Sequence, residues 1–233
     1  MLGTGIYTTS EAAMLLREQP TTVRRWAFGY ARNRAAGRVV HPPLIKTDLP
    51  QIEGEVALTF VELVELLYIR AFERAGVSWP VIQTAADAAS RLFNTEHPFA
   101  LRQLYVDPRS VYVEVKERDG GDSLVELIGH GQHTMSALVK PYLEQLEFDV
   151  HDVASRWWPL GKFGGVVIDP RHSFGAPVVE AVGIRTSVLS AAYDAEHALH
   201  GESALERVSW TYEIASHHVQ AALDFKHWLQ KAA

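Results

Sequence analysis

The chain has 233 residues, of which 47% are hydrophobic and 21% charged, and its formal net charge is −6. These proportions are typical of a globular protein and exclude a disordered, collagen-like or coiled-coil chain. Because there is no cysteine, disulfides, thiolate metal sites and a cysteine nucleophile are also excluded.

The charge is distributed unevenly along the chain. Residues 1–46 carry seven basic and two acidic residues, whereas the rest carries 15 basic and 26 acidic ones. The head is therefore net +5 and the body net −11, which indicates that the head meets a polyanion. We find no targeting segment and no apolar run long enough to span a bilayer, so we expect a cytoplasmic protein without membrane contact.

Residues 8–30 predict a helix, a turn and a second helix. Thr8 and Glu11 fit a capping box, in which each side chain binds a free backbone N–H of the first turn. Pro20 suits the first turn of the second helix, where its missing N–H costs nothing. This segment has the pattern of a helix-turn-helix.

The second of these helices carries candidate DNA contacts. Val23 and Trp26 are three residues apart and would face inward. In a helix-turn-helix the N-terminal residues of the second helix reach base edges in the major groove. Arginine there could bind guanine or phosphate, and threonine could bind phosphate. The alternative is a helical hairpin with an ordinary solvated basic face. The outward-facing candidates are Thr21, Thr22, Arg24 and Arg25.

Residues 31–58 predict a loop with short strands, at the place where a β-wing follows a helix-turn-helix. Arginines in such a wing could follow the DNA backbone or enter the minor groove. The candidates here are Arg32, Arg34 and Arg38.

The segment 59–75 predicts the most apolar helix of the chain, and Gly76 ends it. We interpret it as a buried central helix, with a dimer interface as the alternative. A two-fold pair of helix-turn-helix domains would read two half-sites, so we expect a homodimer on double-stranded DNA. A further helix is predicted over 80–93.

The remaining chain predicts two more parts, which makes the fold α+β: a winged helix-turn-helix domain over 1–97, a mixed α/β middle over 98–158 and a C-terminal domain over 159–233. The middle has strand-like runs separated by turns, and the C-terminal domain has a β-hairpin followed by three helices. The expected strands are 104–106, 111–115, 124–128, 146–150, 166–168 and 177–179, and the expected helices are 135–143, 187–199, 203–212 and 216–229.

The last two helices could form a second helix-turn-helix. Its reading helix would offer few fixed positive charges, and residues 161–233 hold six bases against eight acids. Such a surface competes poorly for phosphate at cellular salt. A protein–protein role is the better interpretation, because interfaces favour aromatic anchors. The aromatic residues there are Trp210, Tyr212, Phe225 and Trp228.

No motif nominates a catalytic or metal centre. The chain has neither a phosphate-binding glycine loop nor a nucleophile elbow, and its carboxylates are scattered. Zinc requires three or four ligands with supporting partners, which the histidine pairs do not supply. We therefore expect neither enzymatic activity nor a bound metal or cofactor. The pairs are His130 with His133, His197 with His200, and His217 with His218.

Several of these segments resemble known families. Residues 164–179 (GGVVIDPRHSFGAPVV), 183–186 (GIRT) and 218–225 (HVQAALDF) resemble a bacterial domain of unknown function that is often found in antitoxins. Residues 58–82 and 156–161 (RWWPLG) resemble the long VapB-type antitoxins that accompany PIN-domain toxins. The head, over 7–26, is similar to the helix-turn-helix of MerR-like and excisionase-like proteins.

The resemblance implies a specific role. VapB-type antitoxins bind and silence a VapC ribonuclease, whose acidic residues hold magnesium, and they repress their own promoter. Most VapB proteins are short and end in a flexible toxin-binding tail, whereas this chain is two to three times longer and is predicted to end in a helix. The resemblance therefore names no toxin-contact residue.

Two other functions remain open. A MerR-like regulator would sense a small molecule in a pocket formed by residues 100–150, and the ligand would change its affinity for DNA. A small enzyme built on the middle region would need a deep polar pocket with clustered carboxylates or histidines.

Overall fold

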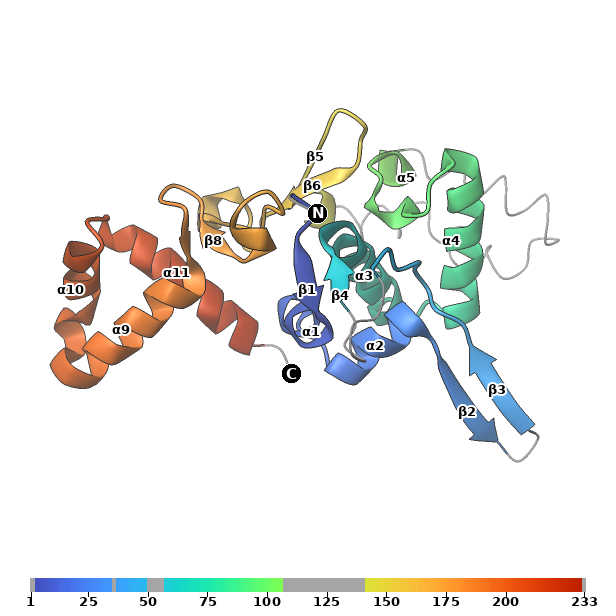
Figure 1. The fold of residues 1–233 in the computed structure, drawn as a ribbon, viewed down its shortest axis with the longest axis horizontal. Helices are drawn as coiled ribbons and strands as arrows, with labels where there is room; N and C mark the ends of the chain where they lie inside the picture. Colours follow the sequence, from blue (N-terminus) through green and yellow to red (C-terminus); the bar gives the residue numbers. More distant parts are fainter. Residues whose placement is uncertain (1–2, 35–36, 50–56, 107–140, 232–233) are drawn as a thin grey trace. The chain divides into compact units, whose positions relative to one another are not determined.

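The computed structural model describes residues 3–34, 37–49, 57–106 and 141–231. They form two compact units, one of Tyr7–Ala154 and one of Met1–Ile6 with Ser155–Ala233. Both units combine helices with small sheets, so the predicted α+β class is confirmed (Figure 1). The division into three domains stays a prediction, because most of the middle part lies outside the described residues.

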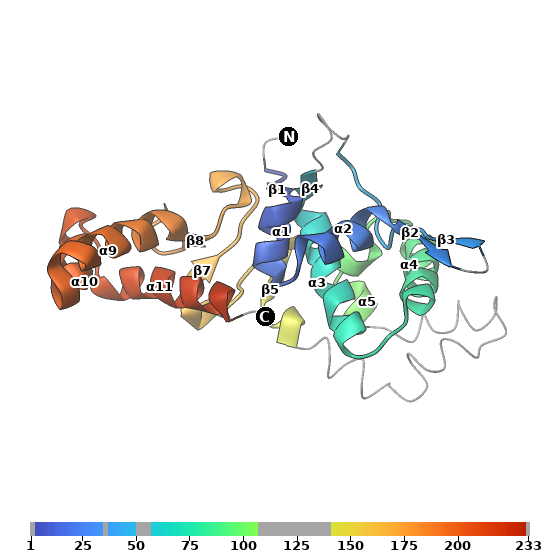
Figure 2. The ribbon, with the colours of Figure 1, turned by 90° about the horizontal axis from the view of Figure 1, so that it is seen from below.

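The first unit is built on three mutually contacting helices, α1, α2 and α3, with α4 packed on α3 (Figure 2). A β-hairpin of β2 and β3 projects beyond them, as the predicted wing requires. A two-stranded sheet of β1 and β4 lies at the start of α1 and α3. The elements are β1 (Ile6–Thr8), α1 (Thr9–Leu16), α2 (Pro20–Phe28), β2 (Tyr30–Arg34), β3 (Gly37–His41), β4 (Ala57–Thr59), α3 (Phe60–Arg74), α4 (Trp79–Phe93), the 3-10 turn η1 (Pro98–Ala100), α5 (Gln103–Val106) and β5 (Leu146–Phe148).

Helix α3 is the core of this unit. Twelve of its 15 residues are buried, which confirms its interpretation as a central helix. Thr59 caps its first turn and forms a capping box with Glu62, and Gly76 lies just beyond its end with a φ of 84°. Burial of this helix also brings the ionisable Glu62, Glu65 and Arg70 into the core, so each needs a partner there.

The prediction of a strand over 104–106 is wrong, because these residues belong to the short helix α5. Leu104 is buried, and a short apolar run of this kind has the same composition in a buried strand and in a buried helical turn. The expected strand over 146–150 is found as β5. The expected strands 111–115 and 124–128, and the helix 135–143 up to residue 140, lie outside the described residues.

The second unit confirms the predicted C-terminal hairpin and its three helices. β7 pairs with β8, and a third strand that the sequence did not indicate, β9, pairs with β8 in turn. Helices α9, α10 and α11 pack on one another, and α11 also packs on β7 and β8. The elements are β6 (Ala154–Trp157), the turns η3 (Lys162–Gly164) and η4 (Ser173–Gly175), β7 (Val166–Val167), β8 (Val178–Val179), β9 (Ile184–Arg185), α9 (Thr186–His200), η5 (Gly201–Ser203), α10 (Ala204–Thr211) and α11 (Ser216–Gln230).

The D-P turn of this unit surrounds a buried carboxylate. Asp169 is 2% exposed and accepts hydrogen bonds from the backbone N–H, Nε and Nη2 of Arg171 at 2.9–3.0 Å. Arg156 Nε lies 3.3 Å from the same carboxylate. Burial alone would raise the pKa of Asp169, but the Arg171 hydrogen bonds and charge outweigh it and lower this pKa. The motif thus has a structural role at this turn.

Candidate nucleic-acid interface

The helix-turn-helix has the local geometry that its sequence predicts. The Thr8 hydroxyl accepts a hydrogen bond from the Glu11 N–H at 3.1 Å, and the Glu11 carboxylate accepts one from the Thr8 N–H at 2.8 Å. Arg17 ends α1 in the left-handed conformation, with a φ of 55°, and so turns the chain toward α2. Helix α2 then begins at Pro20, as predicted.

Burial of one face of α2 fixes which residues it presents to solvent. Val23 and Trp26 are 0% and 2% exposed, as predicted from their spacing. Among the candidates, Thr21, Arg24 and Arg25 are exposed and Thr22 is half-buried.

The turn between α1 and α2 is fixed to the central helix. Glu18 Oε1 lies 3.2 Å from Nε of the buried Arg70 and 2.8 Å from Nη2 of Arg74. These contacts give the core arginine its partner. They also hold the start of α2 in a defined position on α3, which a reading helix needs.

The wing continues directly from the end of α2. Its strands pair Tyr30 with His41, Arg32 with Val39 and Asn33 with Arg38. Because residues directly opposite each other share a face and successive residues alternate, Arg32 lies on the Tyr30 face and Arg38 on the other. Both are exposed. The Arg34 backbone pairs with Gly37, and its side chain lies outside the described part.

Gly29 makes the close approach between α2 and the wing possible. Its φ of 70° and ψ of −179° lie in a region that is essentially restricted to glycine. A Cβ atom here would collide with the carbonyl oxygen of His41 and would lie 2.9 Å from backbone atoms of Pro42 and Pro43. The returning strand therefore passes directly over the end of α2.

The structure brings two of the candidate arginines together on one aromatic ring. The guanidinium carbons of Arg25 in α2 and Arg32 in β2 lie 5.4 Å and 5.9 Å from the Tyr30 ring centroid. Arg24 instead lies 6.0 Å from the Phe28 ring. These distances are in the range of cation–π contacts. Sequence reasoning missed Tyr30, whose only signal was its position after Gly29 at the end of a basic helix.

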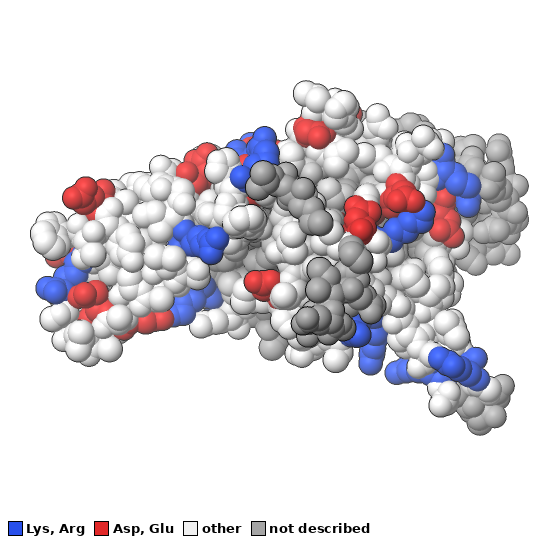
Figure 3. Space-filling view, viewed as in Figure 1, with Lys and Arg blue, Asp and Glu red and all other residues white. Residues whose placement is uncertain are grey.

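This surface is positive and has no acid within it. No Asp or Glu occurs between Glu18 and Asp48, a segment that holds six basic residues. Within the described part of the chain, Arg24, Arg25, Arg32 and Arg38 form no ion pair. In Figure 3 the wing shows basic side chains and no acidic ones.

A partly buried polar network fixes the segment that follows the wing. His97 Nδ1 lies 2.9 Å from Glu65 of α3, and its Nε2 lies 3.1 Å from Asp48. Glu65 also accepts the Phe99 N–H at 3.2 Å, and Glu62 accepts the Asp48 N–H at 2.5 Å. The network ties the chain between β3 and α3 to the core. Nothing in the sequence pattern linked these residues.

The network shifts the pKa values of its two central groups. Burial raises the pKa of Glu65 to about 7, although His97 and the Phe99 N–H both oppose the shift. Burial alone would lower the pKa of His97, but the hydrogen bonds and charges of Glu65 and Asp48 outweigh it and raise this pKa to about 9.

The histidine pair His197 and His200 has ordinary hydrogen-bond and charge partners. His197 Nδ1 lies 3.0 Å from the Gly201 carbonyl oxygen, and the His200 ring lies 3.7 Å from Glu196. His130 and His133 lie outside the described residues. Across the described ranges we find no group of three His, Asp or Glu side chains that could hold a metal ion. None of the helices in these ranges is long and apolar enough to cross a membrane.

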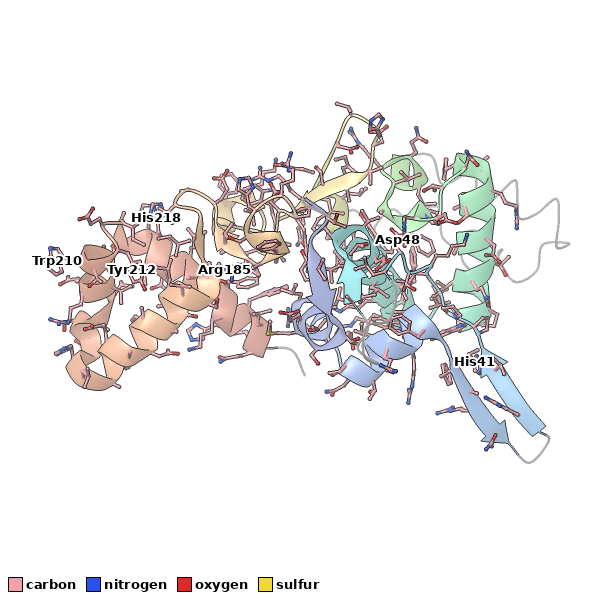
Figure 4. All side chains as sticks on the ribbon, viewed as in Figure 1. His41, Asp48, Arg185, Trp210, Tyr212 and His218 are labelled. Carbon is pink, nitrogen blue, oxygen red and sulfur yellow. The ribbon has the colours of Figure 1, made fainter. Side chains whose placement is uncertain are left out.

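The helix-turn-helix-like pair α10–α11 presents a different surface. Lys226, the basic residue of α11 within the described range, lies 2.5 Å from Asp194. Asp224 accepts a hydrogen bond from Gln220 at 2.8 Å. Of the aromatic residues, Phe225 is buried, whereas Trp210 is 84% exposed and points away from the helices in Figure 4.

The first unit thus has the architecture of a winged helix-turn-helix DNA-binding domain. A family model described as "Putative DNA-binding HTH domain" matches residues 5–86. The chain is 30% identical to "Putative antitoxin VapB45" of Mycobacterium tuberculosis over 229 residues, covering 94% of this chain and 92% of the relative. The crystal structure of Rv2018 from Mycobacterium tuberculosis is similar, with a TM-score of 0.70, 27% identity and coverage of 94% of this chain and 96% of the other. The chain belongs to the family of long VapB-type antitoxins.

Proposed function

We propose that this protein is an antitoxin that binds its own promoter as an autorepressor and neutralises a PIN-domain ribonuclease in the cytoplasm. The observation that carries DNA binding is the positive surface of α2 and the wing, free of acids and attached to a rigid core. The DNA-contacting residues of this proposal are Thr21, Thr22, Arg24, Arg25, Arg32, Arg34 and Arg38.

The exposed groups suggest separate roles in DNA binding. Arg24 and Arg25 lie on the exposed face of α2 and would reach base edges or phosphates in the major groove. Thr21 and Thr22, in the first turn, would bind phosphate. Arg32 and Arg38 lie on opposite faces of the wing, so a wing inserted at a groove would present one arginine toward each strand.

The toxin part of the proposal rests on family membership. The relative is named an antitoxin, and long VapB-type antitoxins resemble this chain over nearly its whole length. The partner is therefore a toxin, and we propose the PIN-domain class. We further propose a homodimer, because one helix-turn-helix contacts one half-site and a two-fold pair reads two.

Binding to the upstream DNA of its own gene tests the repressor role. We expect the full chain to shift this fragment in a gel and to protect two half-sites about one helical turn or a multiple apart. The variant Arg24→Ala/Arg25→Ala should lose about 1–3 kcal/mol for each arginine that reads a base. Unchanged affinity in this variant would eliminate α2 as the reading helix.

Co-expression with the product of the adjacent gene tests the antitoxin role. We expect the two proteins to co-purify and the ribonuclease activity of the partner to fall in the complex. The DNA-binding variant serves as the control, since it should still bind and inhibit the toxin. A partner that remains fully active in the presence of excess antitoxin would refute neutralisation.

The alternative of a ligand-responsive regulator depends on a pocket formed by residues 100–150. Most of this segment lies outside the described residues, so that alternative stays a prediction.

A further inference from the structure

Tyr30 lies where the reading helix, both wing strands and α4 meet. It is the first residue of β2 and follows Gly29, the cap of α2. Its ring stacks on that of its cross-strand partner His41, with centroids 4.5 Å apart and planes inclined by 13°. The ring of Trp79, from the first turn of α4, packs against the Tyr30 ring in a T-shaped arrangement, with centroids 5.4 Å apart and planes inclined by 81°.

The position of this ring is set by several independent contacts. Trp79 Nε1 donates a hydrogen bond to the Pro42 carbonyl at 3.1 Å, and the Trp79 ring also meets His41 at 6.0 Å. His41 is the last residue of β3, so it lies at the base of the wing, where Figure 4 labels it. Because Tyr30 is held by partners on β3 and α4, it can act as a fixed platform for mobile side chains.

Two cationic side chains lie against the Tyr30 ring. Arg25 belongs to the last turn of α2, and Arg32 lies two residues beyond Tyr30 on the same strand face. Both guanidinium groups lie within cation–π range of the one ring. An exposed arginine otherwise samples many rotamers, and ordering it on binding costs free energy. A shared ring at these distances would restrict both arginines before DNA arrives.

We propose that Tyr30 is a positioning residue, which orders Arg25 of the helix and Arg32 of the wing as one cationic pair for neighbouring phosphates. This inference rests on the proposed DNA binding and assigns a role to a residue that does not itself need to touch DNA. Ordering of the two arginines by Tyr30 makes α2 and the wing act as a single contact surface.

The first test compares two substitutions that separate the effect of the aromatic ring from the effect of side-chain volume. Tyr30→Phe keeps the aromatic face, and Tyr30→Leu keeps an apolar side chain against His41 and Trp79 but removes that face. Affinity for the upstream DNA should stay within about twofold in the first and fall about fivefold to tenfold in the second. Equal affinity of the two variants would overturn the proposal.

A mutant cycle distinguishes positioning from general support of the fold. In the background Arg25→Ala/Arg32→Ala, Tyr30→Leu should have no further effect beyond about twofold. If Tyr30→Leu weakens binding equally in both backgrounds, the tyrosine is only a packing residue. If the wild type does not bind the upstream DNA at all, the proposed function fails, and the DNA-free measurement below decides the positioning role.

Side-chain NMR of the free protein supplies that measurement. Protons of Arg25 and Arg32 that lie over the Tyr30 ring should show ring-current shifts in the wild type and in Tyr30→Phe, and should lose them in Tyr30→Leu. Random-coil shifts for both arginines in the wild type would overturn the positioning role, whatever the DNA result.

Discussion

The chain contains a helix-turn-helix, α1–α2, and a helix-turn-helix-like pair, α10–α11, with similar turns and different surfaces. In each, an eight-residue helix is followed by a turn that contains a non-glycine residue in the left-handed conformation. This residue is Arg17 after α1, with a φ of 55°, and Glu213 after α10, with a φ of 54°. Each turn leads into a second helix, α2 or α11. Backbone geometry alone would therefore nominate both segments for DNA binding.

Charge separates the two segments. The exposed arginines of α2 have no carboxylate partner in the described part of the chain, whereas Lys226 of α11 is paired with Asp194. A paired lysine gains little from phosphate, because it must first give up its partner. We therefore predict that a helix-turn-helix backbone is not sufficient for DNA binding here, and that the free charge on the second helix decides which segment binds a polyanion.

The largest expected effect tests this distinction directly. Charge reversal in α2, with Arg24→Glu and Arg25→Glu, should weaken binding to the upstream DNA on the order of a thousandfold, because two attractions become repulsions. The single reversal Lys226→Glu in α11 should change affinity by less than about twofold. Fluorescence anisotropy at several salt concentrations measures both. A comparable loss in the α11 variant would show that the second segment also contacts DNA.

A second prediction concerns the link between α2 and its wing. Gly29→Ala should lower the stability of the first unit by about 2–3 kcal/mol, because the new Cβ meets the backbone of the returning strand in a glycine-only conformation. The control is Gly37→Ala at the wing tip, which also has a positive φ but no atom within 4 Å of its Cβ position. Urea denaturation compares the two. Equal losses would mean that only backbone strain matters, and not the close approach.

Local sequence signals predicted much of this fold. The capping box at Thr8 and the proline at the start of α2 are short-range signals, so they could be predicted from neighbouring residues. The three C-terminal helices were predicted as well, although none of them has a side-chain cap. By contrast, the helix at 103–106 was predicted as a strand, because its apolar run carries no periodic signal that separates the two.

The candidate site was predictable only in part. Spacing identified the exposed arginines of α2, because the buried Val23 and Trp26 define the opposite face. The role of the Tyr30 ring depends on Trp79, which is 49 residues away in sequence, and the partners of His97 come from two other segments. Such contacts are created by tertiary packing and leave no local pattern.

The His97 network gives a third prediction, which concerns pH. The pKa of His97 is raised from 6.5 to about 9 in the fold, so its stabilisation is complete below pH 6.5 and is lost as the pH rises toward 9. Glu65, with a pKa raised to about 7, adds a loss of stability between pH 4.5 and 7. The first unit should therefore lose about 2 kcal/mol between pH 6.5 and 9.

Urea denaturation across this pH range checks the effect. The double variant His97→Gln/Glu65→Gln removes both titrating groups and should flatten the profile. Glu96→Gln is the control, because it changes the neighbouring exposed ion pair with Lys46 and should leave the slope unchanged. A wild-type stability that rises between pH 6.5 and 9 would contradict the assignment of a charged His97.

The smallest expected effect returns to the two helix-turn-helix segments and concerns their caps. Helix α1 is closed by the capping box of Thr8, whereas α11 follows Ala215, which has no side chain able to cap it. Thr8→Ala should cost about 1 kcal/mol, and Ala215→Asp should gain a similar amount, because the new carboxylate can accept free N–H groups of the first turn and lies near the positive end of the helix dipole. Thermal denaturation measures both changes, and Ala215→Asn, which caps without a charge, separates the hydrogen bond from the dipole contribution.

A cap gained at Ala215 should stabilise α11 without creating affinity for DNA, since the added charge is negative. If the Ala215→Asp variant bound DNA through α11, the two segments would differ in the ordering of the second helix and not in its free positive charge.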